Sequence, residues 1–441
     1  MRSINEYLTA SLNYHFSRNE YEVFNRVYNN ALNSSKVSVM LKKLYSLDQW
    51  KFDNNCIRHF TGRFFSIKSI KVELNKENWC QPIIVQPDIG MLALIGSIRN
   101  GRLEFLIQLK VEPGNINYIQ LSPTIQATKS NLDNVHKGGR VKYMELIKNK
   151  NEKDIILLDS ELSEQNSKFL RKKNRNIIKI IDPKKITVED NFIWLTIGQI
   201  KQLSLQDNLI NMDLRSILSG LSLFDGIEED IELPKVINNK QQYLYENELK
   251  KFNIYKSNNL LLELSNYIQK SNRYIKFVKF NELLDWNINT RDIRHKEESF
   301  FRIIGTKINV LGREVKTWEQ PLIKSENNGH NVLFYFKDSH SITLLVQFKV
   351  ECGSIQLAEI APTIQTNNNK HKHVEEKYLY HIYLLNRSNL NFSVKQSEEG
   401  GRFYREENYN SLLEIDKKQK IIIENNIKSN RYHWIELGNI I

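Results

Sequence analysis

The chain has 441 residues, of which 40% are hydrophobic, and it contains 20 Phe, 19 Tyr and 6 Trp. This is enough apolar material for packed cores and excludes a chain that is disordered throughout. The formal net charge is +12, but the basic runs are short and have no interleaved aromatic residues. We therefore interpret the charge as a matter of composition and expect no nucleic-acid partner.

The cysteines and the N-terminal segment limit the cellular setting. Cys56, Cys80 and Cys352 lack metal-binding spacing and cannot all pair, which is typical of a reducing compartment. Residues 1–15 contain no continuous apolar segment, and no run approaches the roughly 18 apolar residues of a membrane span. We expect a cytoplasmic protein without a membrane partner.

The periodicity of apolar residues predicts both helices and strands. Helical spacing covers residues 1–45, 212–223 and 243–268, and a short helix is predicted at 141–148, after Gly138-Gly139. Strands are predicted at 83–86, 91–98 and 103–111, and again at 342–350. The combination indicates an α+β fold in which each domain is a mixed sheet with flanking helices.

A long internal repeat sets the domain organisation. Ile57-Arg58-His59 returns as Ile293-Arg294-His295, and residues 103–126 match 342–365 without a gap, with 11 of 24 positions identical. This spacing is far longer than the 20–50 residues of a solenoid repeat. Because Pro234 follows an acidic, irregular segment at 225–230, we place two tandem domains at 1–232 and 233–441.

Polar side chains on one predicted strand are the first candidate site. Gln108, Lys110 and Glu112 alternate with apolar residues, and the second copy has the same residue types at 347, 349 and 351. Such a strand face suits the floor of a pocket, although a solvated sheet face gives the same pattern. The alternatives stay open at the level of sequence.

Two loops add hydroxyl, amide and charged groups. Residues 121–131 and their counterpart 360–367 combine Ser, Thr, Asn and Gln beside a proline, which fits either ligand hydrogen bonding or simple turn formation. The segment Glu398-Glu399-Gly400-Gly401-Arg402-Phe403-Tyr404 offers close backbone approach, a guanidinium for phosphate and a phenol. The first copy has different residues there, so we expect functionally unequal halves.

Several familiar motifs are absent from the sequence. It contains no GxGxxG, GxxxxGK[ST] or GxSxG segment. His371 and His373 lie in a polar, Asn-rich stretch that favours solvation over metal binding. We therefore predict no cofactor and no metal site.

Read together, these segments resemble the NDP-hexose 2,3-dehydratase family of deoxysugar biosynthesis, and the resemblance covers nearly all of the chain from about residue 40. Cys352, where Pro is expected, and Leu132, where an aromatic residue is usual, depart from the family pattern. The motifs that carry the resemblance are His59-x-Thr61-Gly62-Arg63-Phe64-Phe65, Trp79-x-Gln81-Pro82, Gln86-Pro87-Asp88-Ile89-Gly90, Glu112-Pro113-Gly114-Asn115, Leu121-Ser122-Pro123-Thr124-x-Gln126-Ala127-Thr128, Phe169-Leu170-Arg171-Lys172, Trp194-Leu195-Thr196-x-Gly198-Gln199, Asn211-Met212-Asp213, Gly312-Arg313-Glu314-Val315 and Ser397-Glu398-Glu399-Gly400-Gly401-Arg402-Phe403.

The resemblance implies a homodimer whose subunits each contain two Nudix-like domains and a sugar-nucleotide pocket in each half. As catalytic candidates we take Lys110, Glu112, Arg402 and Tyr404. The substrate-binding residues predicted with them are Trp50, Arg63, Thr128, Lys129, Ser130, Asn131, Leu132, Trp286, Arg313, Thr363, Ile364, Gln365, Thr366, Asn367, Glu399, Gly400, Gly401 and Phe403.

The implied substrate is a dTDP-linked 4-keto-6-deoxyhexose, which would lose water between C2 and C3 and pass to a downstream 3-ketoreductase. This chemistry needs a base, an acid and donors for an enolate oxygen, and no hydride acceptor. A Nudix-type pyrophosphatase is the alternative enzyme, but it needs a Glu-rich helix for Mg²⁺, and the predicted helix at 141–148 has only Glu145. A non-enzymatic basic nucleotide- or nucleic-acid-binding protein is the third possibility.

Overall fold

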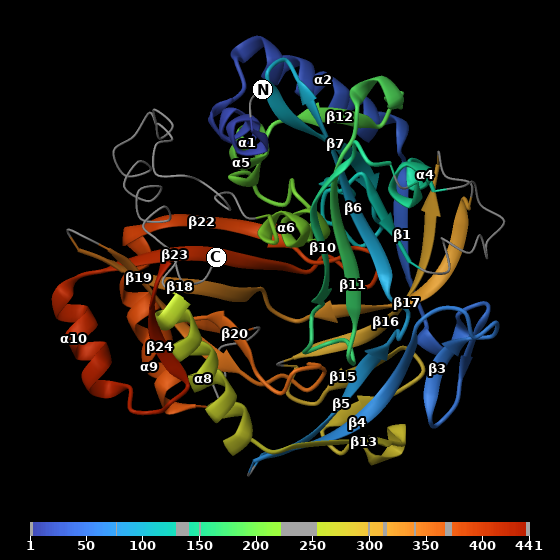
Figure 1. The fold of residues 1–441 in the computed structure, drawn as a ribbon. Helices are drawn as coiled ribbons and strands as arrows, with labels where there is room; N and C mark the ends of the chain where they lie inside the picture. Colours follow the sequence, from blue (N-terminus) through green and yellow to red (C-terminus); the bar gives the residue numbers. More distant parts are fainter. Residues whose placement is uncertain are drawn as a thin grey trace.

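The computed structural model describes residues 3–75, 77–128, 141–149, 151–221, 254–298, 300–311, 315–338, 341–366 and 373–437, with the backbone alone described at 254–258. Within this part of the chain, each half forms a seven-stranded sheet and four strands of a five-stranded sheet, with helices beside them (Figure 1). The predicted α+β class is confirmed, and the chain has two similar halves. The domain boundary near residue 232 lies outside the described residues.

The N-terminal segment forms two capped helices and then a strand. Helices α1 (Ile4–Asn13) and α2 (Arg18–Ser34) each begin with a capping box, in which a serine and a glutamate satisfy the free N–H groups of the first turn. The prediction of helix up to residue 45 was wrong beyond Ser34, because Val37–Lys42 forms strand β1. Its partner β16 lies in the other half of the chain, so local periodicity could not reveal the pairing.

The first seven-stranded sheet carries the predicted polar strand. In it β11 runs parallel to β6 while the other pairs are antiparallel, and the order is β10-β11-β6-β7-β12 with β8 on β7 and β9 on β6. Helices α1, α5 and α6 contribute to the apolar core beside this sheet. The elements are β6 (Gly90–Arg99), β7 (Arg102–Val111), β8 (Ile119–Ser122), β9 (Ile125–Ala127), α4 (Met144–Lys148), β10 (Ile155–Ser163), β11 (Lys173–Ile180), β12 (Phe192–Leu195), α5 (Ile197–Ser204) and α6 (Met212–Ser219).

The second seven-stranded sheet repeats this arrangement. Its order is β20-β19-β18-β23-β22, with β21 on β18 and β24 on β19, and β18 and β23 are the parallel pair. The elements are α8 (Ile254–Lys270), β18 (Gly329–Lys337), β19 (Ile342–Lys349), β20 (Glu359–Pro362), β21 (Ile364–Thr366), α9 (Val374–Leu385), β22 (Leu390–Ser397), β23 (Glu407–Ile415), α10 (Lys417–Asn426) and β24 (Tyr432–Glu436).

The two five-stranded sheets exchange one strand each. Strand β1 of the first half pairs with β16 of the second, and β13 of the second half pairs with β4 of the first. One apolar cluster then takes residues from both halves, including Phe65, Phe169, Phe301 and Phe403. The remaining elements are η1 (Leu44–Ser46), β2 (Trp50–Phe52), β3 (Cys56–His59), β4 (Ser66–Leu74), β5 (Glu77–Val85), η2 (Pro183–Lys185), β13 (Arg273–Val278), η3 (Phe280–Glu282), β14 (Trp286–Ile288), β15 (Asp292–His295), β16 (Phe301–Val310), β17 (Thr317–Ser325) and η4 (Arg387–Asn389).

Most of the locally predicted elements are present with shifted ends. The strands predicted at 91–98 and 103–111 correspond to β6 and β7, and the helix predicted at 141–148 is reduced to α4 because Tyr143 has a left-handed backbone (φ 61°). The helix predicted at 212–223 ends at Ser219. No described helix is long and apolar enough to cross a membrane.

Candidate active site

The carboxylate of Glu112 is the centre of a hydrogen-bonded network just beyond the end of β7. It accepts hydrogen bonds from the side-chain amides of Gln126 (2.8 Å) and Asn115 (3.5 Å) and from the backbone N–H of Gly400 (3.2 Å). The Lys110 ammonium lies 3.5 Å from the same carboxylate and 3.4 Å from the Gln126 carbonyl oxygen. The predicted polar strand face is therefore covered by protein at Glu112 and is not an open solvated surface.

The second half of the chain covers this strand with the loop 398–405, which we call the docking loop. Gly114 donates its N–H to the Gly400 carbonyl (2.8 Å) and accepts the N–H of Arg405 (2.6 Å). A Cβ added to Gly114 would lie 1.8 Å from the Phe403 carbonyl oxygen, so only glycine permits this approach. The cluster of side chains around Lys110 and Glu112 stands where the resemblance implies the sugar-nucleotide pocket of the first half, and we call it the first pocket. It is consequently built from both halves.

Arg402 brings a second cation to the first pocket. Its guanidinium donates to the Gln86 side-chain oxygen through Nε (3.2 Å) and Nη2 (3.1 Å), and it lies 4.3 Å from the centre of the Phe65 ring. Gln86 and Phe65 belong to the first half, whereas Arg402 belongs to the second. The stacked and hydrogen-bonded guanidinium is thus fixed in orientation.

Three carboxyl groups accompany these cations: Glu164, Asp213 and Glu399. Burial raises the pKa of Glu164 to about 8, helped by the negative charge of Glu399. Burial also raises the pKa of Asp213 and of Glu399, and Glu164 adds to the effect at Asp213. Among the described residues, no three His, Cys, Asp or Glu side chains are placed to hold a metal ion. Carboxyl groups whose pKa values are raised in this way are suited to proton transfer.

The second half has an equivalent arrangement, the second pocket. Lys349 lies 3.3 Å from Glu351 and donates to the Gln365 carbonyl (2.9 Å), as Lys110 does in the first pocket. Gly353 donates its N–H to the Asn166 carbonyl (2.7 Å), so residues 164–171 of the first half cover the second pocket. Each half therefore completes the pocket of the other.

The two pockets differ in the groups that their covering loops contribute. The docking loop brings Glu399 and Arg402, and the matching positions in the other loop are Gln165 and Lys168. The Gln165 amide donates a hydrogen bond to the Glu398 carboxylate. In the first pocket Glu399 takes the place of Gln165, and Glu164 takes the place of Glu398. Both members of the pair are therefore carboxyl groups there.

Comparison with known proteins assigns the family. A family model described as NDP-hexose 2,3-dehydratase matches residues 22–221 and 262–441, which is most of the chain. The chain belongs to the NDP-hexose 2,3-dehydratase family. Three relatives are named dTDP-4-dehydro-6-deoxy-alpha-D-glucopyranose 2,3-dehydratase.

The similarity to these dehydratases extends over both halves. The relative from Saccharopolyspora spinosa is 30% identical over 84% of this chain and 77% of its own length. The one from Amycolatopsis orientalis is 32% identical over 81% and 74%, and the one from Streptomyces violaceoruber is 33% identical over 85% and 83%. The family resemblance seen in the sequence motifs is confirmed.

The dehydratase fold brings five of the predicted residues close to Lys110 in the first pocket or its covering loop: Glu112, Glu399, Gly400, Gly401 and Arg402. The Tyr404 ring instead lies against the Arg405 guanidinium (5.6 Å), and among the described residues no hydrogen bond joins its hydroxyl to Lys110 or Glu112. A catalytic role for Tyr404 stays a prediction that this geometry does not strengthen.

Three predicted binding residues are aromatic residues of the central core. The indole N–H of Trp50 donates to the Glu319 carbonyl (2.8 Å), and that of Trp286 donates to the Cys80 carbonyl (2.8 Å). Phe403 is buried against Phe169, with ring centres 6.0 Å apart. These contacts give all three a packing role, so their binding role stays a prediction.

The other predicted binding residues are dispersed. The exposed Arg63 lies in the turn before Phe65, and Thr128 follows β9. In the second half Thr363 and Ile364 are fully buried, while Gln365 contacts Lys349 and Thr366 pairs with His330. Lys129, Ser130, Asn131, Leu132, Arg313 and Asn367 lie outside the described residues.

Sequence reasoning did not select Glu164, Lys172 or Asp213 as site residues. Lys172 is buried, which lowers the pKa of its ammonium, and it donates to the Asp88 carbonyl (2.6 Å). Lys172 and Asp213 do stand in motifs of the family resemblance, Phe169-Leu170-Arg171-Lys172 and Asn211-Met212-Asp213. These motifs could have indicated Lys172 and Asp213 from the sequence. Only the tertiary structure brings them together with Glu164.

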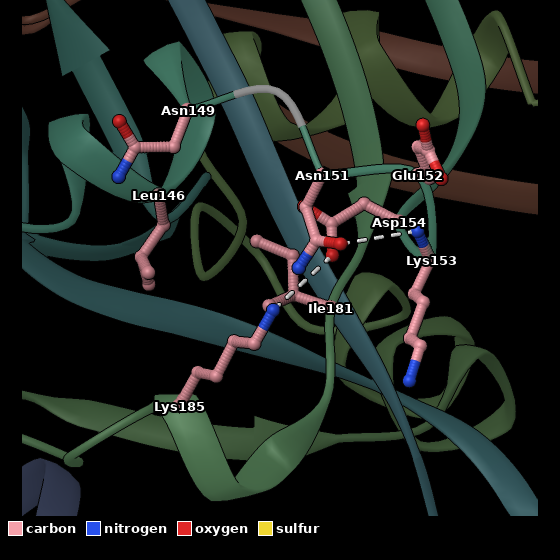
Figure 2. A pocket seen from close by; sticks show the side chains of 8 residues that line it. All are labelled: Leu146, Asn149, Asn151, Glu152, Lys153, Asp154, Ile181 and Lys185. Atoms are coloured by element: carbon pink, nitrogen blue, oxygen red, sulfur yellow. Dashed lines mark hydrogen bonds and ion pairs between the residues drawn. The ribbon is translucent and has the colours of Figure 1, made fainter.

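A separate cavity of about 670 Å³ lies near α4 and does not share residues with the first pocket (Figure 2). Beside it, the buried Lys179 ammonium donates to the carbonyls of Leu146 (2.8 Å) and Asn149 (2.7 Å) and pairs with Asp154 (3.0 Å). This lysine is therefore satisfied by protein groups. The residues that line the cavity are Leu146, Asn149, Asn151, Glu152, Lys153, Asp154, Ile181 and Lys185.

The raised pKa of Glu164 predicts a pH-dependent stability. The carboxyl titrates near pH 4.5 when unfolded and near 8 when folded, so the folded state holds the proton over this window and loses stability as the pH rises through it. Glu164→Gln should weaken this dependence, by at most about 1.4 kcal/mol per pH unit. Thermal unfolding at pH 5.5 and pH 8 measures the difference. Glu161→Gln, on the exposed face of β10, controls for loss of charge; equal slopes in wild type and Glu164→Gln would contradict the prediction.

Proposed function

We propose that this protein is a sugar-nucleotide 2,3-dehydratase that converts dTDP-4-keto-6-deoxyglucose to the 2,6-dideoxy-3,4-diketo sugar. Family membership and the printed activity of three relatives support the reaction class. The observation that carries the proposal within the fold is the first pocket, where Lys110 and Arg402 converge with the carboxyl groups of Glu164, Asp213 and Glu399 from both halves.

The reaction needs only proton transfers and charge stabilisation. The C3 hydrogen is acidic because it is α to the C4 ketone, and its removal gives an enolate that expels the C2 hydroxyl in the β position. The enol formed by this loss of water tautomerises to the 3,4-diketone. Lys110 and Arg402 supply positive charge for the enolate, and the carboxyl groups supply the proton acceptor and donor.

The catalytic pocket in this proposal is the first one. Glu399 is its proton acceptor, since a carboxylate whose charge is disfavoured by burial is a stronger base. The matching residue in the second pocket is Gln165, whose amide cannot accept a proton at neutral pH. The second pocket keeps the lysine and glutamate of the strand but not this group, which supports unequal roles for the two halves.

Glu112 has a supporting role in this proposal. Its two oxygens already accept three hydrogen bonds and pair with Lys110. A carboxylate held in this way fixes the Lys110 ammonium and links β7 to the docking loop. We therefore assign it to positioning Lys110 rather than to proton transfer.

The pyrophosphatase alternative finds little support in the helices that would hold Mg²⁺. In α9, the counterpart of α4, Glu375 accepts hydrogen bonds from the backbone N–H groups of Lys428 and Ser429 (both 2.9 Å). The described part of α4 contains Glu145 as its acidic residue. Assembly as a homodimer, a cytoplasmic location, the Nudix-like relationship and a 3-ketoreductase as pathway partner stay predictions.

The test is incubation of the purified protein with dTDP-4-keto-6-deoxyglucose, followed by mass spectrometry. We expect loss of the mass of one water molecule, with a 3-ketoreductase added to trap the labile diketone. The reaction should proceed without added NAD and after dialysis against a chelator. An absolute requirement for NAD or Mg²⁺, or release of a nucleoside monophosphate, would contradict the proposal.

A further inference from the structure

Asp213 is a buried carboxyl group with one oxygen that no described residue bonds. It is the second residue of α6, and 3% of its surface is exposed. The helix cap does not use it, because the Asn211 side chain accepts the N–H of Leu214 (2.8 Å). Within the described part of the chain, its Oδ1 has no hydrogen-bond partner. Buried polar atoms are normally paired, so this oxygen is available to a ligand.

Helix α6 lies where the two halves meet. Arg215 of this helix donates to the Gln396 side chain (3.0 Å) and to the Ser397 carbonyl (2.9 Å), both in β22, and Figure 1 shows α6 beside that strand. The docking loop continues directly from Ser397. Arg215 thus fixes α6, and with it Asp213, relative to the loop that carries Glu399 and Arg402.

The charges around Asp213 favour its neutral, protonated form. Burial is the main cause of its raised pKa, electrostatic interaction with the carboxyl groups of Glu164, Glu399 and Glu112 adds to it, and Lys110 only partly opposes them. A neutral carboxylic acid has an O–H that it can donate, unlike a carboxylate. Asp213 is therefore a proton donor whose Oδ1 is not engaged by any residue that the structure describes.

We propose that Asp213 is the catalytic acid that protonates the departing C2 hydroxyl group. The assignment rests on the dehydratase function proposed above. In this step the C2–O bond breaks and its electron pair stays on the oxygen, which takes the proton from the Asp213 O–H and leaves as water. The enolate electrons form the C2–C3 double bond, and the Asp213 carboxylate regains a proton from solvent.

Exchange of the C3 hydrogen with solvent distinguishes loss of the catalytic acid from loss of the catalytic base. Asp213→Asn keeps the shape of the side chain but removes the transferable proton, so dehydration should fall by about 10²–10⁴-fold. Removal of the C3 proton does not need the acid, so substrate recovered from D₂O should contain deuterium at C3. Proton NMR is needed to locate the label, because the C5 hydrogen is also α to the ketone.

These measurements distinguish failure of the proposed dehydratase function from failure of the assignment of Asp213 as the acid. If the wild-type protein forms no dehydrated product, the proposed function itself is wrong. If the wild-type protein is active and Asp213→Asn dehydrates the substrate at a rate within a few-fold of the wild-type rate, the assignment is overturned. Loss of both exchange and dehydration, with dTDP binding and thermal unfolding retained, would place Asp213 at the C3 proton or the enolate oxygen and would also overturn it. Asp159→Asn, an exposed residue of β10, is the matched control and should leave turnover unchanged.

Discussion

Replacing Lys110 with Met should lower turnover by about 10²–10⁴-fold while the protein stays folded. The methionine keeps the apolar stem of the lysine but removes the ammonium that lies 3.5 Å from Glu112 and faces the first pocket. Without this cation, the enolate loses one of the two positive charges that we assign to its stabilisation. Steady-state kinetics with the dTDP sugar, together with thermal unfolding, measures the effect.

The chain provides its own control for this prediction in Lys349. That residue makes the same contacts in the second pocket, at 3.3 Å from Glu351, and its side chain is 20% exposed against 17% for Lys110. Lys349→Met should therefore perturb folding to a similar extent but reduce turnover far less. A larger loss of turnover in Lys349→Met than in Lys110→Met would show that the catalytic pocket has been assigned to the wrong half.

Gly114→Ala should nearly abolish activity by displacing the docking loop. The added Cβ would lie 1.8 Å from the Phe403 carbonyl oxygen and 2.5 Å from the Gly400 carbonyl oxygen, and backbone atoms cannot yield without movement of the loop. Movement of the loop would withdraw the Gly400 N–H from Glu112 and shift Arg402 and Glu399. A misplacement of about 1 Å in a catalytic site can cost about 10²-fold in rate, and overpacking costs about 1–3 kcal/mol of stability.

Gly353→Ala is the matched variant at the second pocket. Its Cβ would lie 1.7 Å from the Phe169 carbonyl oxygen, so the loss of stability should be comparable. Turnover should fall less than in Gly114→Ala, because the displaced loop brings Gln165 and Lys168 to the second pocket, and only Glu164 at its start belongs to the first. Kinetics and denaturant unfolding of both variants provide the comparison. Equal losses of turnover would indicate that the two pockets act together in catalysis.

The sequence predicted those features that depend on local pattern or on repetition. The alternation of apolar and polar residues at 103–111 gave β7, and the match between 103–126 and 342–365 revealed the duplication. Gly400, Gly401 and Arg402 were selected because two glycines beside an arginine suit close approach to a ligand. The structure places Arg402, which belongs to the second half of the chain, beside Gln86 of the first half.

What failed at the level of sequence depended on contacts between distant residues. Val37–Lys42 was assigned to a helical region because its partner strand β16 begins more than 250 residues later. Strand pairing is set by such remote partners. Periodicity within a short window contains no information about them.

The sequence by itself determined the family, the α+β class, the duplication and the polar strand that holds Lys110 and Glu112, since each of these is written in residue order. Only the tertiary structure decided that the docking loop of one half completes the pocket of the other, and that Asp213 and Glu164 join it. The physical reason is that the ionisation of these carboxyl groups depends on burial and on neighbouring charges, and both are created when the two halves pack together.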